Sequence, residues 1–239
     1  IISDFLEYIK TVRRYSSHTI RSYEHDLDQY FSFCRDFDPT REFKDLDHTA
    51  IQGYLQQLSR RGLSARTLAR HLASVKSLYK YMLIKNLVKV NITQSVKSPK
   101  IKQELPHFLS LKEAENILRI PVGNDEKALR ERLILELFYA TGIRISELIS
   151  IQLNDIRMEE GIIHIMGKGS KERIVMVGTE AMDTLRNYIE ILNENGLAGP
   201  DNYLFPALRK GKNGKRSHIA QRTVFNIVKK YLKQVSDDE

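Results

Sequence analysis

Arg144 is the residue whose surroundings most clearly indicate chemistry. It follows Thr141-Gly142, where a helix should end, and its neighbours in the sequence are mostly apolar. A long cation in apolar surroundings is costly unless an anion is provided for it. Two kinds of anion fit the spacing: a carboxylate of the chain, Glu147 or Asp155, and an external group such as a phosphate. The sequence alone leaves both open.

A second basic position lies in a predicted β-hairpin. Alternating apolar residues flank the stretch Gly167-Lys168-Gly169-Ser170-Lys171-Glu172, which predicts two strands joined by a glycine-rich tip. From this tip Lys168 and Lys171 can reach a backbone phosphate. The stretch does not fit a nucleotide-binding loop, because Gly161 lies one residue too far upstream and because that motif must open a helix.

Other residue types that commonly do chemistry are not arranged for it. The 7 histidines include no H-E-x-x-H pattern, the single Cys34 rules out a multi-cysteine zinc site, and no G-x-S-x-G is present. We therefore expect neither a metal nor a cofactor. A single cysteine fits a reducing compartment, and the sequence shows no apolar stretch of about 20 residues and no leader-like start. We expect a soluble cytoplasmic protein.

The distribution of charge indicates the partner. The 239 residues carry 38 Lys and Arg against 30 Asp and Glu, a net charge of +8. Residues 48–103 and 204–234 contain no Asp or Glu at all. A short charged run is usually just a solvated face, but packing does not exclude acids from stretches this long, whereas repulsion from phosphates does. The two basic stretches therefore predict that the chain binds nucleic acid.

A helix predicted for residues 64–84 gives one basic stretch its geometry. Apolar residues recur on one helical stripe, at Leu68, Leu72, Val75, Tyr79 and Met82. The opposite arc carries Arg66, Arg70, Ser77 and Lys80, with Lys76 on its flank. One face should pack on a core, and the other should contact a DNA backbone or groove.

Periodicity divides the chain into two domains. Residues 1–92 show helical patterns alone and predict a compact four-helix domain. Residues 93–108 lose periodicity and contain two prolines with Lys97, Lys100 and Lys102, which is typical of an extended basic linker. Residues 109–239 form a second domain, and it begins with the capping box Ser110-Leu111-Lys112-Glu113.

The second domain should be rich in helices around a small antiparallel sheet. A helix over 127–139 ends at Thr141-Gly142, and a new helical turn begins near Ser146. The alternating residues of the hairpin follow, at Ile163, Ile165, Ile174 and Met176. Helices return at 180–192 and 221–232. The predicted fold class is therefore mainly α.

Several of these motifs, in order, resemble the tyrosine site-specific recombinases of the phage integrase family, most closely the Xer type. They are Ala140-Thr141-Gly142-Ile143-Arg144-Ile145-Ser146-Glu147-Leu148, then Leu153-x-Asp155-Ile156, then Gly167-Lys168-Gly169-Ser170-Lys171-Glu172-Arg173. In the first domain, Ser17-x-Thr19-Ile20-x-x-Tyr23-x-x-Asp26-Leu27 and residues 63–70 resemble the SAM-like core-binding domain, and Ser98-Pro99-Lys100 resembles its linker. The resemblance covers essentially the whole chain.

The resemblance implies metal-free transfer of DNA strands. In this family a tyrosine attacks the scissile phosphate, forms a 3′-phosphotyrosyl link and expels a 5′-hydroxyl, while cations stabilise the charge on the non-bridging oxygens. By residue-to-residue match, Arg144 is the first of two catalytic arginines, and Lys168 is the lysine that protonates the leaving oxygen. Glu147 is a supporting residue that orients the arginine helix. The expected DNA contacts are Arg66, Arg70, Lys76, Lys80, Lys97, Lys100, Lys171, Arg173 and Arg222.

The chain departs from the family pattern at its C-terminal side. The family continues with His-x-x-Arg, a further His or Trp and the nucleophilic Tyr, beyond a segment like residues 222–231. None of the 11 tyrosines stands in the nucleophile's place, and Tyr231 belongs to the preceding helix. We therefore expect these residues to bind DNA without cutting it. Either they belong to a longer recombinase or they form a naturally truncated, non-catalytic DNA-binding relative; an RNA-binding or scaffolding role has little support.

The resemblance also implies partners and tasks. Expected partners are double-stranded DNA and, on two DNA sites, a tetramer of this protein or of it with a paralogous recombinase, with a division or translocase protein as an accessory. Two tasks share this chemistry: chromosome dimer resolution and integration of a mobile element. The first would link the protein to chromosome partition, the cell cycle and cell division. The sequence does not choose between them.

Overall fold

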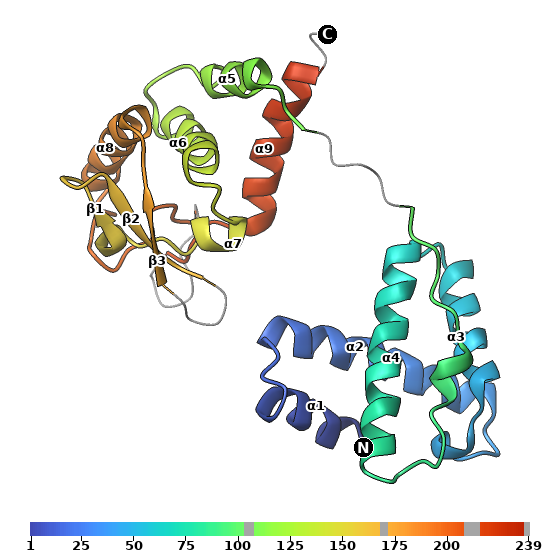
Figure 1. The fold of residues 1–239 in the computed structure, drawn as a ribbon. Coiled ribbons are helices and arrows are strands. Elements are labelled where there is room, and N and C mark those ends of the chain that lie inside the picture. Colours follow the sequence, from blue (N-terminus) through green and yellow to red (C-terminus); the bar gives the residue numbers. More distant parts are fainter. Residues whose placement is uncertain (103–107, 168–171, 208–215, 237–239) are drawn as a thin grey trace. The chain divides into compact units, whose positions relative to one another are not determined.

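The structure is a computed structural model, and it describes residues 1–102, 108–167, 172–207 and 216–236. The chain forms two compact units, Ile1–Leu105 and Pro106–Glu239 (Figure 1). The first unit is helical, and the second combines helices with a three-stranded sheet. The predicted fold class is thus confirmed.

The first unit is built from α1 (Ile2–Thr11), α2 (Ser17–Phe37), α3 (His48–Arg60) and α4 (Ala65–Ile84). Short polar side chains begin three of these helices, because Ser16, Asp47 and Ser64 each accept a hydrogen bond from a backbone N–H of the first turn. Helix α4 packs against α1, α2 and α3, and it crosses in front of α2 in the view of Figure 1. The four predicted helices are therefore confirmed.

The core of this unit is organised along α4. All five residues of the predicted apolar stripe are buried, as the helical spacing requires. Burying a side chain of this size contributes about 1.5–3 kcal/mol, so the stripe fixes which face of α4 turns outward. Two short 3₁₀ turns, η1 (Phe43–Asp45) and η2 (Ile92–Ser95), complete the unit. Thr93 and Val96, which fall in the predicted linker, are buried in this unit, so its packing extends past residue 92.

The second unit begins with α5 (Leu111–Arg119), α6 (Glu126–Thr141) and the short α7 (Ile145–Leu148). The predicted capping box is present, with the Ser110 and Glu113 side chains each bonded to the other's backbone N–H. Helix α6 ends where Gly142 adopts a left-handed conformation with φ 59°, which glycine tolerates without strain. After η3 (Leu153–Asp155) and the sheet, helices α8 (Thr179–Glu194) and α9 (Gln221–Ser236) follow.

The sheet has the order β1-β2-β3 and is antiparallel, with β1 (Ile156–Arg157), β2 (Ile162–Met166) and β3 (Glu172–Met176). Ile163 pairs with Val175, and Ile165 pairs with Arg173. Paired residues share a face of the sheet, so Arg173 lies on the same face as the two buried isoleucines of β2. The predicted hairpin is confirmed, while its tip, residues 168–171, lies outside the described residues.

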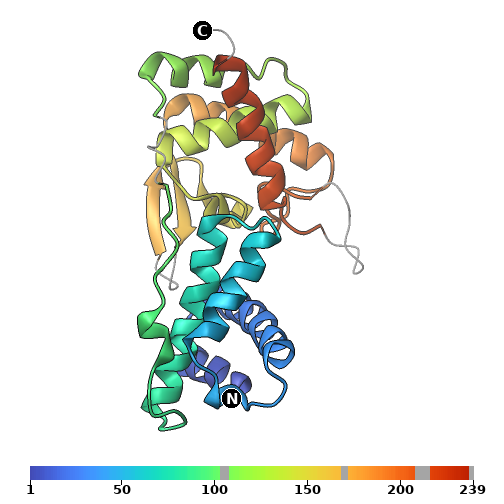
Figure 2. The same ribbon diagram turned by 90° about the vertical axis from the view of Figure 1, so that its right-hand side faces the viewer.

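The sheet packs on helix α6. Helix α6 packs against α5, α8, α9 and strand β3, and α9 also contacts α5 and α7. Figure 2 shows α9 running past α6 within this unit. Through these contacts the C-terminal end of α6, the start of α7 and strand β3 occupy fixed positions, and the candidate site lies there. In the described part of the chain, no helix combines the length and the apolar character needed to cross a bilayer.

Candidate phosphate-binding site and DNA-facing surface

The junction between α6 and α7 holds Arg144 at a helix start. Thr141 donates its hydroxyl to the carbonyl of Leu137 at 2.5 Å, and Gly142 then reverses the chain. Arg144 is the N-cap of α7 with extended backbone, φ −79° and ψ 153°. The Arg144 side chain is 72% exposed, so it extends outward from a well-defined backbone position.

Glu147 anchors this turn. Its Oε2 accepts the backbone N–H of Arg144 at 2.8 Å, and its Oε1 accepts Nη1 of the same residue at 2.9 Å. Arg173 donates a second pair of hydrogen bonds, Nη1 to Oε1 at 2.9 Å and Nη2 to Oε2 at 2.8 Å. The carboxylate is only 5% exposed. Hydrogen bonds from Arg173, followed by those from Arg144, lower the pKa of Glu147 to about 2.

Arg144 is paired with a carboxylate of the chain itself. Glu147 is the carboxylate that pairs with Arg144, whereas Asp155 accepts the backbone N–H of Gln152 at 2.8 Å. A guanidinium has five N–H donors, and the bond to Glu147 is made by Nη1 alone. Glu147 therefore orients Arg144, while the rest of its 72% exposed side chain faces solvent.

Arg173, which was expected to contact DNA, is paired with Glu147. The residue belongs to the face of β3 that carries Val175, and its guanidinium forms a two-pronged pair with Glu147. Pairing with Glu147 raises the pKa of Arg173. Sequence reasoning missed this contact, because a basic residue after a basic loop looks the same whether it faces solvent or a buried acid. Of the other hairpin predictions, Lys168 and Lys171 lie outside the described residues.

The predicted basic face of α4 is only partly free. Arg66 and Lys80 are exposed, and Lys76 is half-buried. Arg70 instead donates Nη1 to Oδ1 of Asp26 on α2 at 2.5 Å, although its side chain is 44% exposed. Lys97 and Lys100 are exposed after η2, and Arg222 is exposed in the first turn of α9. These positions remain predicted DNA contacts.

A buried polar cluster lies beneath the α4 surface. Asp26 is fully buried and accepts a hydrogen bond from the hydroxyl of Ser74 at 2.9 Å. Nδ1 of His71 lies 2.8 Å from the Tyr54 hydroxyl and 3.5 Å from Oδ1 of Asp26. Burial lowers the pKa of His71. Sequence reasoning missed this cluster; its one signal was a carboxylate in the buried stripe of α2, beside Leu27 and Tyr30.

The last helix is attached to α6 by a second polar cluster. The Tyr231 hydroxyl donates to Oε2 of Glu131 at 2.5 Å, and Nζ of Lys230 lies 3.1 Å from the same oxygen. The Lys230 ammonium also lies 4.3 Å from the centre of the Tyr231 ring. Tyr231 is buried, and its hydroxyl is committed to Glu131.

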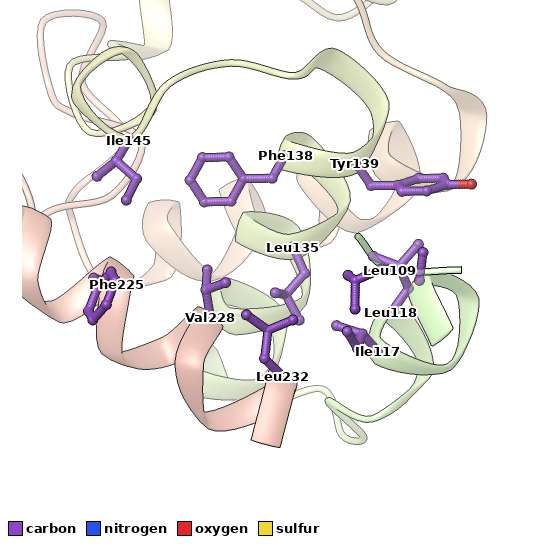
Figure 3. A pocket seen from close by; sticks show the side chains of 11 residues that line it. Leu109, Ile117, Leu118, Leu135, Phe138, Tyr139, Ile145, Phe225, Val228 and Leu232 are labelled. Atoms are coloured by element: carbon purple, nitrogen blue, oxygen red, sulfur yellow. The ribbon is translucent and has the colours of Figure 1, made fainter. Parts of the chain in front are cut away.

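An apolar groove of about 370 Å³ runs between α5, α6, α7 and α9. Figure 3 shows Phe138 and Ile145 at one side of it, Phe225 and Val228 of α9 below them, and Leu109 with Ile117 at the other end. Phe225 and Tyr139 are 51% and 54% exposed. The groove adjoins the Arg144 turn, because Ile145 follows Arg144 directly.

Comparison with known families identifies the class of protein. The profile of the phage integrase family matches residues 107–239, and that of the phage integrase N-terminal SAM-like domain matches residues 2–86. Tyrosine recombinase XerC of Thermodesulfovibrio yellowstonii is 35% identical over 236 residues, 97% of this chain and 75% of the relative. XerD of Oceanobacillus iheyensis is 35% identical over 188 residues, 79% of this chain and 63% of the relative. The chain belongs to the phage integrase family, and it is a Xer-like member of the tyrosine recombinases.

Solved structures share the fold. A post-cleavage complex of the XerH site-specific recombinase bound to a palindromic difH substrate matches with a TM-score of 0.67 and 23% identity, over 99% of this chain and 68% of that one. A lambda integrase tetramer bound to a Holliday junction matches with a TM-score of 0.65 and 16% identity, over 98% of this chain and 65% of that one. At these identities the likeness establishes architecture only.

Proposed function

We propose that this chain is the DNA-recognising and phosphate-binding part of a recombinase that cuts and rejoins duplex DNA at specific sites through a 3′-phosphotyrosyl intermediate. The observation that carries the proposal is Arg144, exposed at the N-cap of α7 and held there by a buried, ionised Glu147. A fixed cation with outward donors is what a reacting phosphate requires. Family membership supplies the reaction class.

In this proposal Arg144 contacts the non-bridging oxygens of the scissile phosphate. As attack by the nucleophile moves negative charge onto those oxygens, the guanidinium stabilises the transition state more than the ground state. Because Glu147 already fixes the side chain, little conformational freedom is lost when the phosphate arrives. A lysine, with a single point charge, would not reproduce the two-pronged contact.

Lys168 is proposed as the general acid that protonates the leaving 5′-oxygen. The nucleophilic tyrosine and the His-x-x-Arg pair are assigned to sequence that the relatives possess beyond these 239 residues; the chain spans 75% of one relative and 63% of another. Supporting this assignment, the Tyr231 hydroxyl is bonded to Glu131. The tyrosine keeps the phosphodiester energy in the covalent link, so the reaction needs no nucleotide cofactor.

The proposed partners are duplex DNA and further copies of the recombinase, or of a paralogue, in a tetramer. The support is that the relatives are named XerC and XerD and that one structural neighbour is a tetramer on a Holliday junction. Chromosome dimer resolution is the task we favour over mobile-element integration, because several similar relatives are named XerC or XerD. A cytoplasmic location and an accessory division or translocase protein would follow from that task.

The test uses the longest natural protein that contains these residues. It is incubated, without added metal, with supercoiled plasmids that carry candidate sites, and products are separated under denaturing conditions to detect a covalent protein–DNA adduct. Arg144→Ala and Lys168→Ala are compared with Arg157→Ala, a change on the exposed residue of β1.

We expect an adduct with the unaltered protein and with Arg157→Ala, and a loss of at least about a hundredfold with Arg144→Ala, the order of magnitude for removing a donor from a transition-state oxyanion. If no adduct forms while salt-sensitive binding to duplex DNA persists, the protein is a non-catalytic DNA-binding relative. If binding is insensitive to salt or prefers RNA, the DNA proposal itself is wrong.

A further inference from the structure

One carboxylate in the second unit serves two arginines from different elements. Glu147 on α7 accepts hydrogen bonds from Arg144, at the start of the same helix, and from Arg173 on β3. Both Arg173 bonds come from terminal nitrogens, one to each carboxylate oxygen, at 2.9 and 2.8 Å. Arg144 adds a single guanidinium bond to Oε1. Arg173 is therefore the better-paired partner of the two.

The pairing register explains why Arg173 points at this acid. Arg173 is opposite Ile165, which is buried, so its side chain leaves the sheet on the packed face. An arginine on that face needs an anion, and the buried Glu147 provides one. The contact also ties β3 to α7. Lys168 lies between β2 and β3 in the sequence. Strand β3, which follows Lys168, is therefore also the strand that is bonded to α7, the helix that begins after Arg144.

The pairing of Arg173 with Glu147 affects the net charge around Arg144. Arg144, Glu147 and Arg173 together carry one net positive charge. If Arg173 were neutral, the charges of Arg144 and Glu147 would cancel, and the carboxylate would be free to draw the whole Arg144 fork inward. With Arg173 present, both carboxylate oxygens are already occupied, and Arg144 keeps its remaining donors and its charge for an external phosphate.

We infer that Arg173 is a positioning residue: by occupying Glu147, it holds the Arg144 guanidinium outward and charged for phosphate binding. The inference rests on the proposed function of Arg144, and it replaces the expectation that Arg173 itself contacts DNA. A direct DNA contact and a positioning residue predict different results. If Arg173 contacts DNA directly, its effect on binding does not depend on Glu147 or Arg144. If Arg173 positions Arg144, its effect on binding depends on both.

The decisive experiment is a set of double-mutant cycles on DNA binding. Binding of a fluorescent duplex to this chain is measured by anisotropy at several salt concentrations for Arg144→Gln, Arg173→Gln and Glu147→Gln, and for the doubles Arg144→Gln/Arg173→Gln and Glu147→Gln/Arg173→Gln. Arg157→Gln is the matched control, since Arg157 is an arginine of the same sheet whose Nη1 bonds only to backbone carbonyls in the described structure. Circular dichroism checks that each variant is folded.

We expect Arg144→Gln and Arg173→Gln each to weaken binding about tenfold, the order expected for one hydrogen bond to a charged group, with the first double no more than about twofold worse than either single. Adding Glu147→Gln to Arg173→Gln should restore binding to within about threefold of the unaltered chain, since nothing then neutralises Arg144. The remaining deficit reflects the loss of the bonds by which Glu147 orients Arg144. Additive losses, or no rescue by Glu147→Gln, would overturn the inference and return Arg173 to a direct DNA contact. A purely structural role would likewise give no rescue.

A second measurement separates this inference from the proposed function. The side-chain N–H signals of Arg144 are followed by NMR in DNA-free protein. Arg173→Gln should shift them, because Glu147 takes up the whole fork, and Arg157→Gln should not. If Arg144→Gln left DNA binding unchanged, the proposed role of Arg144 in phosphate binding would be wrong. The NMR signals of Arg144 would still show whether Arg173 controls the position of its guanidinium. Unshifted Arg144 signals in Arg173→Gln would refute the inference whatever the DNA result.

Discussion

The guanidinium of Arg70 on α4 reaches Asp26 on α2, with Nη1 2.5 Å from Oδ1. Asp26 is fully buried, whereas the Arg70 side chain is 44% exposed. This pair therefore joins the inside of the first unit to the surface predicted to contact DNA. The hydroxyl of Ser74, one turn further along α4, bonds to the other oxygen of the same carboxylate, so two residues of α4 fix the rotation of that helix against α2.

Removal of this arginine should cost much more than removal of its neighbour. Arg70→Gln leaves the Asp26 carboxylate buried without its cation, and we expect a loss of about 3 kcal/mol in the free energy of unfolding. Arg66→Gln, one turn earlier and exposed, should change it by less than about 0.5 kcal/mol. Urea unfolding followed by circular dichroism gives both values. Equal effects would show that Asp26 does not depend on Arg70.

The ionisation of Glu147 predicts a loss of stability in acid. Its pKa falls from 4.5 to about 2 on folding, so the unfolded chain binds a proton more readily than the folded one. The corresponding stability is fully present above pH 4.5 and disappears as the pH falls towards 2. Melting temperatures measured across this range should fall less steeply for Glu147→Gln than for the unaltered chain. Parallel curves would mean that the carboxylate is not held ionised by the two arginines.

Local signals in the sequence predicted much of this structure. The stripe of α4, the capping box at Ser110 and the helix end at Gly142 each depend on residues within one or two helical turns. The pairing of Arg144 with Glu147, three residues apart, was one of the alternatives that the spacing offered. Such features can be found because spacing along the chain determines them.

The features that could not be predicted depend on contacts between distant segments. In β3 the apolar residues Ile174 and Met176 are 58% and 80% exposed, while the face with Arg173 turns inward. Alternation is identical for both faces of a strand, and only the pairing register decides between them. The pairing of Arg70 with Asp26 depends on packing between helices in the same way, and β1, with two residues, is too short for a periodic signal.

The attachment of α9 to α6 should depend on one hydroxyl. In Tyr231→Phe, Glu131 keeps the bond from Lys230 and loses the 2.5 Å bond from the hydroxyl. A hydrogen bond to a charged group contributes on the order of 1.5–3 kcal/mol, so thermal unfolding of the second unit should occur at a clearly lower temperature. Tyr139→Phe is the control, because Tyr139 is 54% exposed. If both variants melt alike, α9 is held by apolar packing alone.

The outward face of α4 should carry the salt dependence of DNA binding. Arg66 and Lys80 are exposed, and neither belongs to the Asp26 cluster. Removing one cation that neutralises a phosphate should reduce the slope of log affinity against log salt by about 0.9, so Arg66→Gln and Lys80→Gln should each lower the slope by that amount.

Lys44→Gln is the control for these slopes, since Lys44 is a cation of the same unit that already pairs with Glu42 at 2.8 Å. Arg70→Gln should lower the slope less than Arg66→Gln does, because the Arg70 charge is balanced by Asp26. Titrations of a duplex at four or more salt concentrations measure these slopes, and unchanged slopes for Arg66→Gln and Lys80→Gln would place the DNA-contacting surface elsewhere on the unit.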